Sequence, residues 1–101
     1  MKDAVKIKEQ DNVAVALRDL AKGEQIAAGG MDITVAEPIK MGHKFALENM
    51  KKGETVIKYG FPIGTLKDHV TAGAHIHVHN LATSLDSSLT YRYHPVVISG
   101  R

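Results

Sequence analysis

Short apolar runs separated by turn residues fill most of the chain, and this pattern favours strands over helices. Strands are predicted at residues 5–7, 25–27, 33–36, 55–59, 62–66 and 74–79. Between residues 12 and 22, Val13, Leu17 and Leu20 have helical spacing, and Gly23 provides a helix end. We therefore predict a mainly β domain of short strands with one or two short helices.

One short pattern occurs three times along the chain. It consists of an apolar residue, two spacers, a glycine, two spacers and a second apolar residue, and its glycines are Gly23, Gly53 and Gly73. An apolar anchor in a tight turn, followed by a glycine that tolerates positive φ, redirects the chain into a new strand. Because the three glycines are unevenly spaced, a strongly bent β domain fits better than a solenoid of identical repeats.

Size, charge and cysteine content narrow the range of functions. The 101 residues, 44% of them apolar, suffice for one compact domain but are few for a deep catalytic cleft. The net charge is only +2, and the charged residues are spread along the chain without a basic stripe, so we expect no nucleic-acid partner. Without cysteine, any metal must be held by histidine, carboxylate or carbonyl groups. No signal peptide or membrane-spanning run is found, so we expect a cytoplasmic protein without a membrane partner.

Histidines alternate with apolar residues in the sequence AHIHVHN at residues 74–80. Since side chains alternate between the two faces of a strand, Ile76 and Val78 are expected to face the core. The opposite face would then carry His75, His77 and His79. Neighbouring histidines on one face are close enough to share a divalent metal if other segments complete the site. The alternative is a solvated strand face without a chemical role.

A turn glycine at position 42 precedes the adjacent pair His43 and Lys44. A cation beside an imidazole suits a substrate carboxylate, although such a pair is also common on solvated surfaces. Lys58 and Tyr59 are further ligand candidates, for which a snorkelling lysine and a half-buried ring are the structural explanation. The chain has no phosphate-binding glycine loop, nucleophile elbow or dinucleotide fingerprint.

Four sequence blocks resemble altronate dehydratases in content and order. They are DNVAVAL at 11–17, GHKFAL at 42–47, VIKYG at 56–60 and HVHN at 77–80. The sequence YRYHP at 91–95 is also similar to that family, so the resemblance covers most of residues 5–95. It implies an SAF-type domain with a β-clip fold at residues 1–85, followed by a linker or arm at 86–101.

The resemblance also implies a role in hexuronate catabolism. Altronate dehydratases convert D-altronate to 2-keto-3-deoxy-D-gluconate with a divalent metal, typically Fe²⁺. In that family, a domain of this kind works with a much larger catalytic region, in the same chain or as a separate subunit. We therefore expect a small subunit or N-terminal domain that is inactive without its partner; homo-oligomer formation stays open.

Histidines suit this reaction because imidazole transfers protons near neutral pH, while a metal stabilises developing negative charge. Our hypothesis assigns catalysis to His77 and His79. The expected metal ligands are His75, His77 and His79. The expected substrate-binding residues are His43, Lys44 and Asn80.

Three other functions remain open at this point. The chain is also similar to the small subunit of sulfolactate sulfo-lyase, which eliminates sulfite in place of water. It could alternatively be a module that only binds a carbohydrate or a partner. A purely structural role is the third alternative, because a fold does not determine a function.

Overall fold

The computed structural model describes residues 2–77 and 79–82, which form nine strands and no helix. The strands are β1 (Ala4–Val5), β2 (Val13–Ala16), β3 (Gln25–Ala28), β4 (Met31–Thr34), β5 (Lys44–Ala46), β6 (Thr55–Lys58), β7 (Phe61–Leu66), β8 (His75–Ile76) and β9 (Leu81–Ala82). All strand pairs described are antiparallel. The mainly β domain of short, bent strands predicted from the sequence is confirmed.

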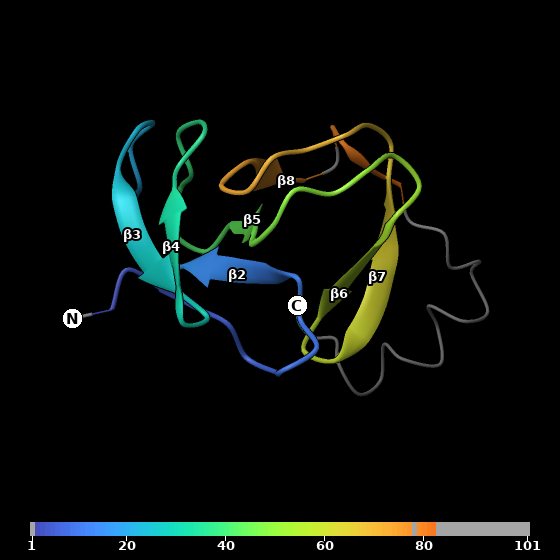
Figure 1. The fold of residues 1–101 in the computed structure, drawn as a ribbon, viewed down its shortest axis with the longest axis horizontal. Helices are drawn as coiled ribbons and strands as arrows, with labels where there is room; N and C mark the ends of the chain where they lie inside the picture. Colours follow the sequence, from blue (N-terminus) through green and yellow to red (C-terminus); the bar gives the residue numbers. More distant parts are fainter. Residues whose placement is uncertain (1, 78, 83–101) are drawn as a thin grey trace.

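Three sheets make up the domain. A four-stranded sheet has the order β1-β2-β5-β8, β3 and β4 form a two-stranded sheet, and a third sheet has the order β6-β7-β9. Figure 1 shows β2 and β5 between the β3–β4 hairpin on the left and the β6–β7 hairpin on the right. The central sheet therefore joins the two hairpins, and its β5–β8 edge carries the residues considered below.

The helix predicted within residues 12–22 is wrong. Residues Val13–Ala16 form β2, whose two edges pair with β1 and β5. Leu17 is 42% exposed, so it does not belong to a buried helical stripe. Pairing with distant strands on both sides satisfies the backbone polar groups of this segment, and tertiary contacts override its helical spacing.

The other strand predictions differ from the structure mainly at their ends. β3, β6 and β7 lie where strands were predicted, whereas β4 begins two residues before the predicted start at residue 33. The reason is the Gly29–Gly30 turn, which pairs Ala28 directly with Met31. β2, β5 and β9 were not predicted, since each contains at most four residues and depends on pairing partners elsewhere.

The glycine pattern found in the sequence corresponds to a real structural unit. Its three glycines have φ between 88° and 90°. The structure contains a fourth copy that was missed, formed by Ile39, Gly42 and Phe45, with a φ of 87° at the glycine. The apolar anchors of the four copies pair in isolated bridges, Leu20 with Ile39 and Met50 with Val70.

Equivalent hydrogen bonds show that the domain contains the same unit twice. In the first half, Asp19 Oδ1 accepts a hydrogen bond from Met41 N at 2.8 Å. In the second half, Asn49 Oδ1 accepts one from Ala72 N at 2.9 Å. Each half thus consists of a hairpin flanked by two glycine turns, and β5 at the end of the first half pairs with β8 at the end of the second.

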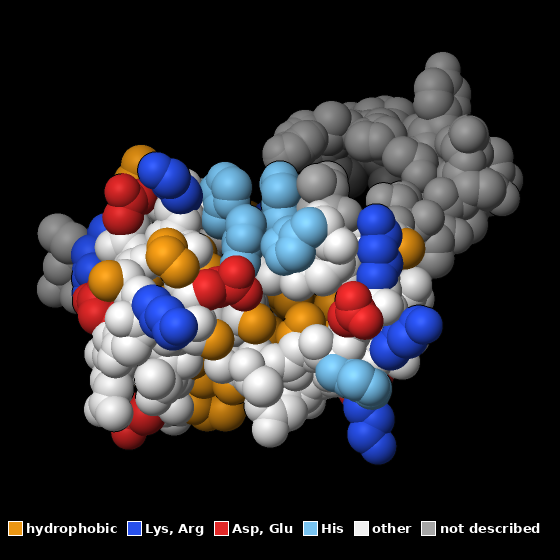
Figure 2. Space-filling model, turned by 90° about the horizontal axis from the view of Figure 1, so that it is seen from above, with side chains coloured by type: hydrophobic (Ala, Val, Ile, Leu, Met, Phe, Trp, Pro, Cys, Tyr) orange, Lys and Arg blue, Asp and Glu red, His pale blue; other side chains and the backbone are white. Residues whose placement is uncertain are grey.

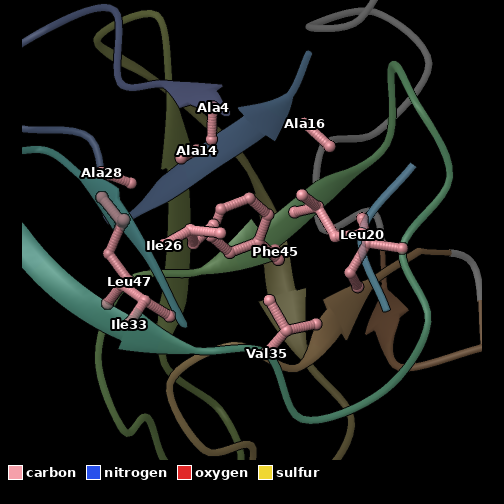
Figure 3. Close-up of a cluster of buried hydrophobic side chains, with 11 residues drawn as sticks. Ala4, Ala14, Ala16, Leu20, Ile26, Ala28, Ile33, Val35, Phe45 and Leu47 are labelled. Carbon is pink, nitrogen blue, oxygen red and sulfur yellow. The ribbon is translucent and has the colours of Figure 1, made fainter. Parts of the chain in front are cut away.

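Two apolar clusters form the core. Figure 3 shows Phe45 at the centre of the first cluster, with Ile26 and Val35 beside it. Ile76 belongs to the second cluster, and both Phe45 and Ile76 are 0% exposed. Burial of such a side chain contributes about 1.5–3 kcal/mol. These two residues therefore anchor β5 and β8, the strands that carry the candidate site.

Some predictions concern residues that the structure does not describe. The inward orientation expected for Val78, the domain boundary at residue 85 and the arm at 86–101 all lie outside the described residues. Within the part of the chain that is described, no helix is long and apolar enough to cross a membrane.

Candidate functional site

Four histidines gather on one face of the domain, which Figure 2 shows as a group of pale blue side chains. His43 precedes β5, His75 lies in β8, and His77 and His79 follow β8. Antiparallel pairing of β5 with β8 aligns Lys44 with Ile76 and brings the two histidine segments together. The sequence placed His43 apart from the other three, whereas the fold unites all four.

The rings of the cluster are close and partly stacked. The ring centroid of His43 lies 5.0 Å from that of His75 and 5.0 Å from that of His77. The centroid of His75 lies 5.4 Å from that of His77 and 5.3 Å from that of His79. His75 is therefore the common neighbour of the other three rings.

The tightest contact in the cluster joins two ring nitrogens. His43 Nδ1 and His75 Nε2 are 2.9 Å apart, a hydrogen-bonding distance. One of these nitrogens must carry the shared proton while the other accepts it, and the tautomer determines which does so. A metal ion that bound both nitrogens would have to displace this shared proton.

A turn, and not strand alternation, brings His77 and His79 to the cluster. The strand predicted over residues 74–79 ends at Ile76, because the carbonyl of His77 accepts hydrogen bonds from Asn80 N at 3.0 Å and Leu81 N at 2.9 Å. Asparagine competes with strand pairing by binding nearby backbone groups through its side chain. The prediction of a continuous strand face is therefore wrong, although the three histidines do lie near one another.

Asn80 holds this turn from inside the protein. Its Oδ1 accepts a hydrogen bond from His77 N at 2.9 Å, and its Nδ2 donates one to the carbonyl of His75 at 2.7 Å. The residue is only 7% exposed. In this arrangement Asn80 positions the backbone of the two histidines, and both polar groups of its side chain take part in these hydrogen bonds.

Lys44 lies half-buried beside the cluster. Burial and then the positive charge of Lys58 lower the pKa of its ammonium group. Among the described residues, the ion pairs join Arg18 to Asp3 and Glu24, and none includes Lys44. A half-buried cation with no carboxylate partner in the described part of the chain makes this part of the site attractive to an anion.

Two histidines of the cluster favour the neutral imidazole. Burial lowers the pKa of His75, with further lowering by His43, His79 and His77, while Glu37 acts in the opposite direction. Loss of solvation and the charge of Lys44 lower the pKa of His77. A neutral imidazole has a free nitrogen that can accept a proton or bind a metal.

The structure offers two groups of metal-binding side chains that share His75. One consists of His43, His75 and His77, and the other of Glu37, His75 and His79; within each group the ligand atoms lie within 4.8 Å of one another. These donors fit a divalent transition metal, which takes imidazole and carboxylate ligands. The set predicted from the sequence, His75, His77 and His79, is divided between the two groups.

Glu37 was missed by the analysis of the sequence. Its Oε2 accepts a hydrogen bond from His75 N at 3.0 Å, although 38 positions separate the two residues. The loop after β4 reaches β8 because Ala36 N donates to the carbonyl of Gly73 at 3.0 Å. The signal in the sequence is the glycine pattern at residues 39–45, which repeats the pattern at residues 70–76. Glu37 lies two residues before the first of these turns.

The remaining candidates lie elsewhere or have structural explanations. His69 Nδ1 accepts a hydrogen bond from Lys52 N at 3.2 Å and is not part of the cluster. Lys58 Nζ lies 4.9 Å from the ring centroid of Tyr59, at the β6–β7 turn. A hollow of about 580 Å³ is lined by residues 2–9 and 27–30, and none of the clustered histidines lines it.

Comparison with known proteins finds similar sequences in two kinds of lyase. The altronate dehydratase of Bacillus subtilis is 48% identical over 95 residues, which cover 94% of this chain and 19% of the relative. The altronate dehydratase of Escherichia coli is 46% identical over 91 residues, covering 90% of this chain and 18% of the relative. The chain therefore spans about a fifth of the length of these two enzymes.

A second kind of relative is a separate small subunit. The alpha subunit of (2R)-sulfolactate sulfo-lyase from Chromohalobacter salexigens is 33% identical over 75 residues, covering 68% of this chain and 80% of the relative. The altronate/galactarate dehydratase SAF domain matches residues 2–84. On the strength of that match and the two dehydratase relatives, the chain belongs to the family of altronate/galactarate dehydratase SAF domains.

Proposed function

We propose that the chain is the small subunit or N-terminal domain of an altronate dehydratase-type hydro-lyase. It contributes side chains to the dehydration of D-altronate to 2-keto-3-deoxy-D-gluconate. The observation that carries this proposal is the cluster of His43, His75, His77 and His79 beside Lys44. Since the dehydratase relatives are about five times longer, a large catalytic region is the necessary partner.

Dehydration of a sugar acid needs three kinds of help. A base removes the proton from carbon 2, an acid protonates the hydroxyl group leaving carbon 3, and the resulting enol becomes the 2-keto acid. Negative charge develops on the substrate carboxylate as the proton leaves, so that charge must be stabilised. Imidazole, ammonium and metal ions are the groups that supply these functions in enzymes.

The exposed histidines of the cluster suit the proton transfers. His77 and His79 are both exposed, so a substrate held by the partner region can reach them. The lowered pKa of His77 favours its neutral imidazole, the form that can accept a proton or bind a metal. Lys44 attracts the substrate carboxylate, with His43 beside it to accept or donate a hydrogen bond.

The same cluster fits a divalent metal, which we propose to be Fe²⁺ shared with the partner region. When bound, such an ion supplies Lewis-acid stabilisation of the negative charge that develops on the acid. The residues that could hold it belong to one of two groups, either His43, His75 and His77 or Glu37, His75 and His79. Asn80 and Glu37 orient the backbone of the histidine segment through hydrogen bonds to His77 and His75.

Reconstitution tests this proposal. Formation of 2-keto acid from altronate is measured under anaerobic conditions with Fe²⁺, for the chain alone, for the large region alone and for their mixture. We expect turnover only in the mixture. Full activity of the large region by itself would instead make this chain an accessory module that binds a partner or a carbohydrate.

Substitution of single histidines then locates the chemistry. Loss of a general acid or base typically slows a reaction by about 10²–10⁴-fold. We expect His77→Ala and His79→Ala to lower kcat of the mixture within this range. His69→Ala, which lies outside the cluster, is the matched control. Unchanged turnover in both cluster variants would refute the catalytic assignment.

A sulfo-lyase function is the second candidate. It is favoured by one observation, namely that the chain covers 80% of the sulfolactate sulfo-lyase alpha subunit, itself a small subunit. The reconstituted complex is therefore also given (2R)-sulfolactate, and sulfite release is measured. Release of sulfite without dehydration of altronate would favour this second function.

A further inference from the structure

We propose that the chain by itself binds a divalent transition-metal ion through His43, His75 and His77, with His79 outside the ligand set. This inference rests on the proposed function for the use of the metal and deepens it by assigning the ligands. It departs from the set predicted from the sequence, because His43 replaces His79. With His77 bound to the ion, its nitrogen no longer accepts a proton, and proton transfer is left to His79. Metal binding is measured without turnover, so it is tested independently of dehydration.

The first argument is the spacing of two ring nitrogens. Transition metals hold imidazole nitrogens at about 2.0–2.1 Å, so two ligands at right angles lie about 2.9 Å apart. His43 Nδ1 and His75 Nε2 are 2.9 Å apart. They already have the separation of neighbouring ligands. To bind an ion, both rings lose the proton that they share and rotate so that the two nitrogens point to a common position beside the line that joins them.

The third ligand comes from the turn after β8. One ring nitrogen of His77 lies within 4.8 Å of the ligand atoms of His43 and His75. The ring centroid of His77 is 5.0 Å from that of His43 and 5.4 Å from that of His75. Rotation of an exposed side chain is sufficient to close this gap, and three protein ligands leave positions free for a substrate.

The backbone of all three ligands is held in place before any ion binds. The carbonyl of His43 accepts a hydrogen bond from Ala16 N at 2.9 Å. His75 is followed by Ile76 in the core, and Asn80 holds the backbone of His77. A metal site whose ligands are already positioned loses little conformational entropy on binding.

The competing group of Glu37, His75 and His79 fits less well. One carboxylate oxygen of Glu37 accepts the hydrogen bond from His75 N at 3.0 Å, which assigns this side chain to holding β8. Nε2 of His75 faces His43 in the hydrogen bond between the two rings. Glu37 therefore acts as a positioning residue, and its negative charge lies near the imidazole of His75.

Titration of the untagged 101-residue chain with anaerobic Fe²⁺, and with Co²⁺ as a coloured probe, tests the assignment. We expect one ion per chain, and His43→Gln, His75→Gln and His77→Gln should each weaken binding by more than about 100-fold, since even lost second-shell partners cost 10–100-fold. His79→Gln and the control His69→Gln should bind as the unchanged chain does. Loss of binding in His79→Gln and Glu37→Gln, but not in His43→Gln, would overturn the proposal in favour of the second group.

If a variant fails to fold, the assignment is tested instead by a measurement on the unchanged chain. Imidazole ¹⁵N resonances of the unchanged chain are followed by NMR as Zn²⁺ is added, and those of His43, His75 and His77 should shift while those of His69 and His79 should not. Absence of binding would overturn this inference even if the reconstituted complex dehydrates altronate, because the metal then belongs to the large region. Binding without dehydration would instead contradict the proposed function and leave the metal site standing.

Discussion

The ammonium group of Lys44 lies half-buried near Lys58 and the imidazole of His77. Each of these neighbours is cationic or neutral, so the local field favours the arrival of an anion. Asn80 differs from Lys44, because its side chain is buried and both of its polar groups already have hydrogen-bond partners. One residue is therefore available to a ligand, while the other supports the site from within.

Replacement of Lys44 should weaken substrate binding in the reconstituted complex. A hydrogen bond to a charged group is worth about 1.5–3 kcal/mol, which corresponds to about 10–100-fold in affinity. We expect Lys44→Met to raise KM for altronate by this factor, and Lys44→Arg to restore part of the loss. An unchanged KM in Lys44→Met would show that the carboxylate binds elsewhere.

Replacement of Asn80 should destabilise the turn that carries His77. Asn80→Ala leaves His77 N and the carbonyl of His75 without their partners, which costs about 1–3 kcal/mol per buried group. The control is Asn49→Ala, since Asn49 is exposed and makes a single hydrogen bond to Ala72 N. Urea denaturation of the chain measures both. Equal losses of unfolding free energy in the two variants would show that the Asn80 turn contributes no more stability than the exposed hydrogen bond of Asn49.

The strands and turns are placed by the repeated glycine unit. Each of its copies ends in a buried apolar residue, and the two halves of the domain make the same hydrogen bonds. In the second half the closing turn packs against the loop after β4, which brings Glu37 to His75. The position of β8, and with it the candidate site, thus depends on close packing at one glycine.

A comparison of two glycines with the same φ distinguishes the free-energy cost of disturbing this close packing from the cost of backbone strain. Gly23 and Gly73 both have a φ of +88°, where an alanine costs about 1–2 kcal/mol. A Cβ atom at Gly23 would meet nothing within 4 Å, whereas one at Gly73 would overlap the carbonyl oxygen of Thr34. We expect Gly73→Ala to lower the free energy of unfolding several kcal/mol further than Gly23→Ala, as urea denaturation would measure. Equal losses would mean that the loop moves away freely.

At the scale of the whole molecule, the histidines with a lowered pKa lie together in one cluster. His75 is faced by His43, His77, His79 and Glu37, and His77 by Lys44, His43 and His79. These neighbours and burial make the folded domain bind protons less readily than the unfolded chain does. Its stability is therefore linked to pH through the same side chains that form the candidate site.

Stability should fall as the solution becomes acidic through the range just below pH 6.5. The pKa values of His75 and His77 are lowered from 6.5 in the folded state, so the unfolded state takes up more protons there and is favoured. Well above pH 6.5, where the unfolded state has also lost these protons, both states are neutral at these positions and the effect disappears. Urea denaturation at a series of pH values measures this, and the double variant His75→Gln, His77→Gln should have a smaller slope. A slope that is unchanged in the double variant would assign it to other groups.

Local features were predictable because their causes lie within a few residues. The turn glycines at 23, 53 and 73 require positive φ whatever the surroundings, and the lack of cysteine limits the metal donors to nitrogen and oxygen. The blocks at 42–47 and 77–80 indicated the family, which the comparisons confirm. From the sequence by itself, therefore, the bent β domain, its family and the kinds of side chain available to hold a metal follow.

Only the tertiary structure decided how these parts meet. Residues 13–16 become a strand because β1 and β5 pair with them, against their helical spacing. His43 meets His75 across 32 positions and Glu37 meets it across 38, and no local pattern encodes those distances. Strand pairing and close packing at Gly73 are non-local interactions, whose free energy arises only when the whole domain has formed.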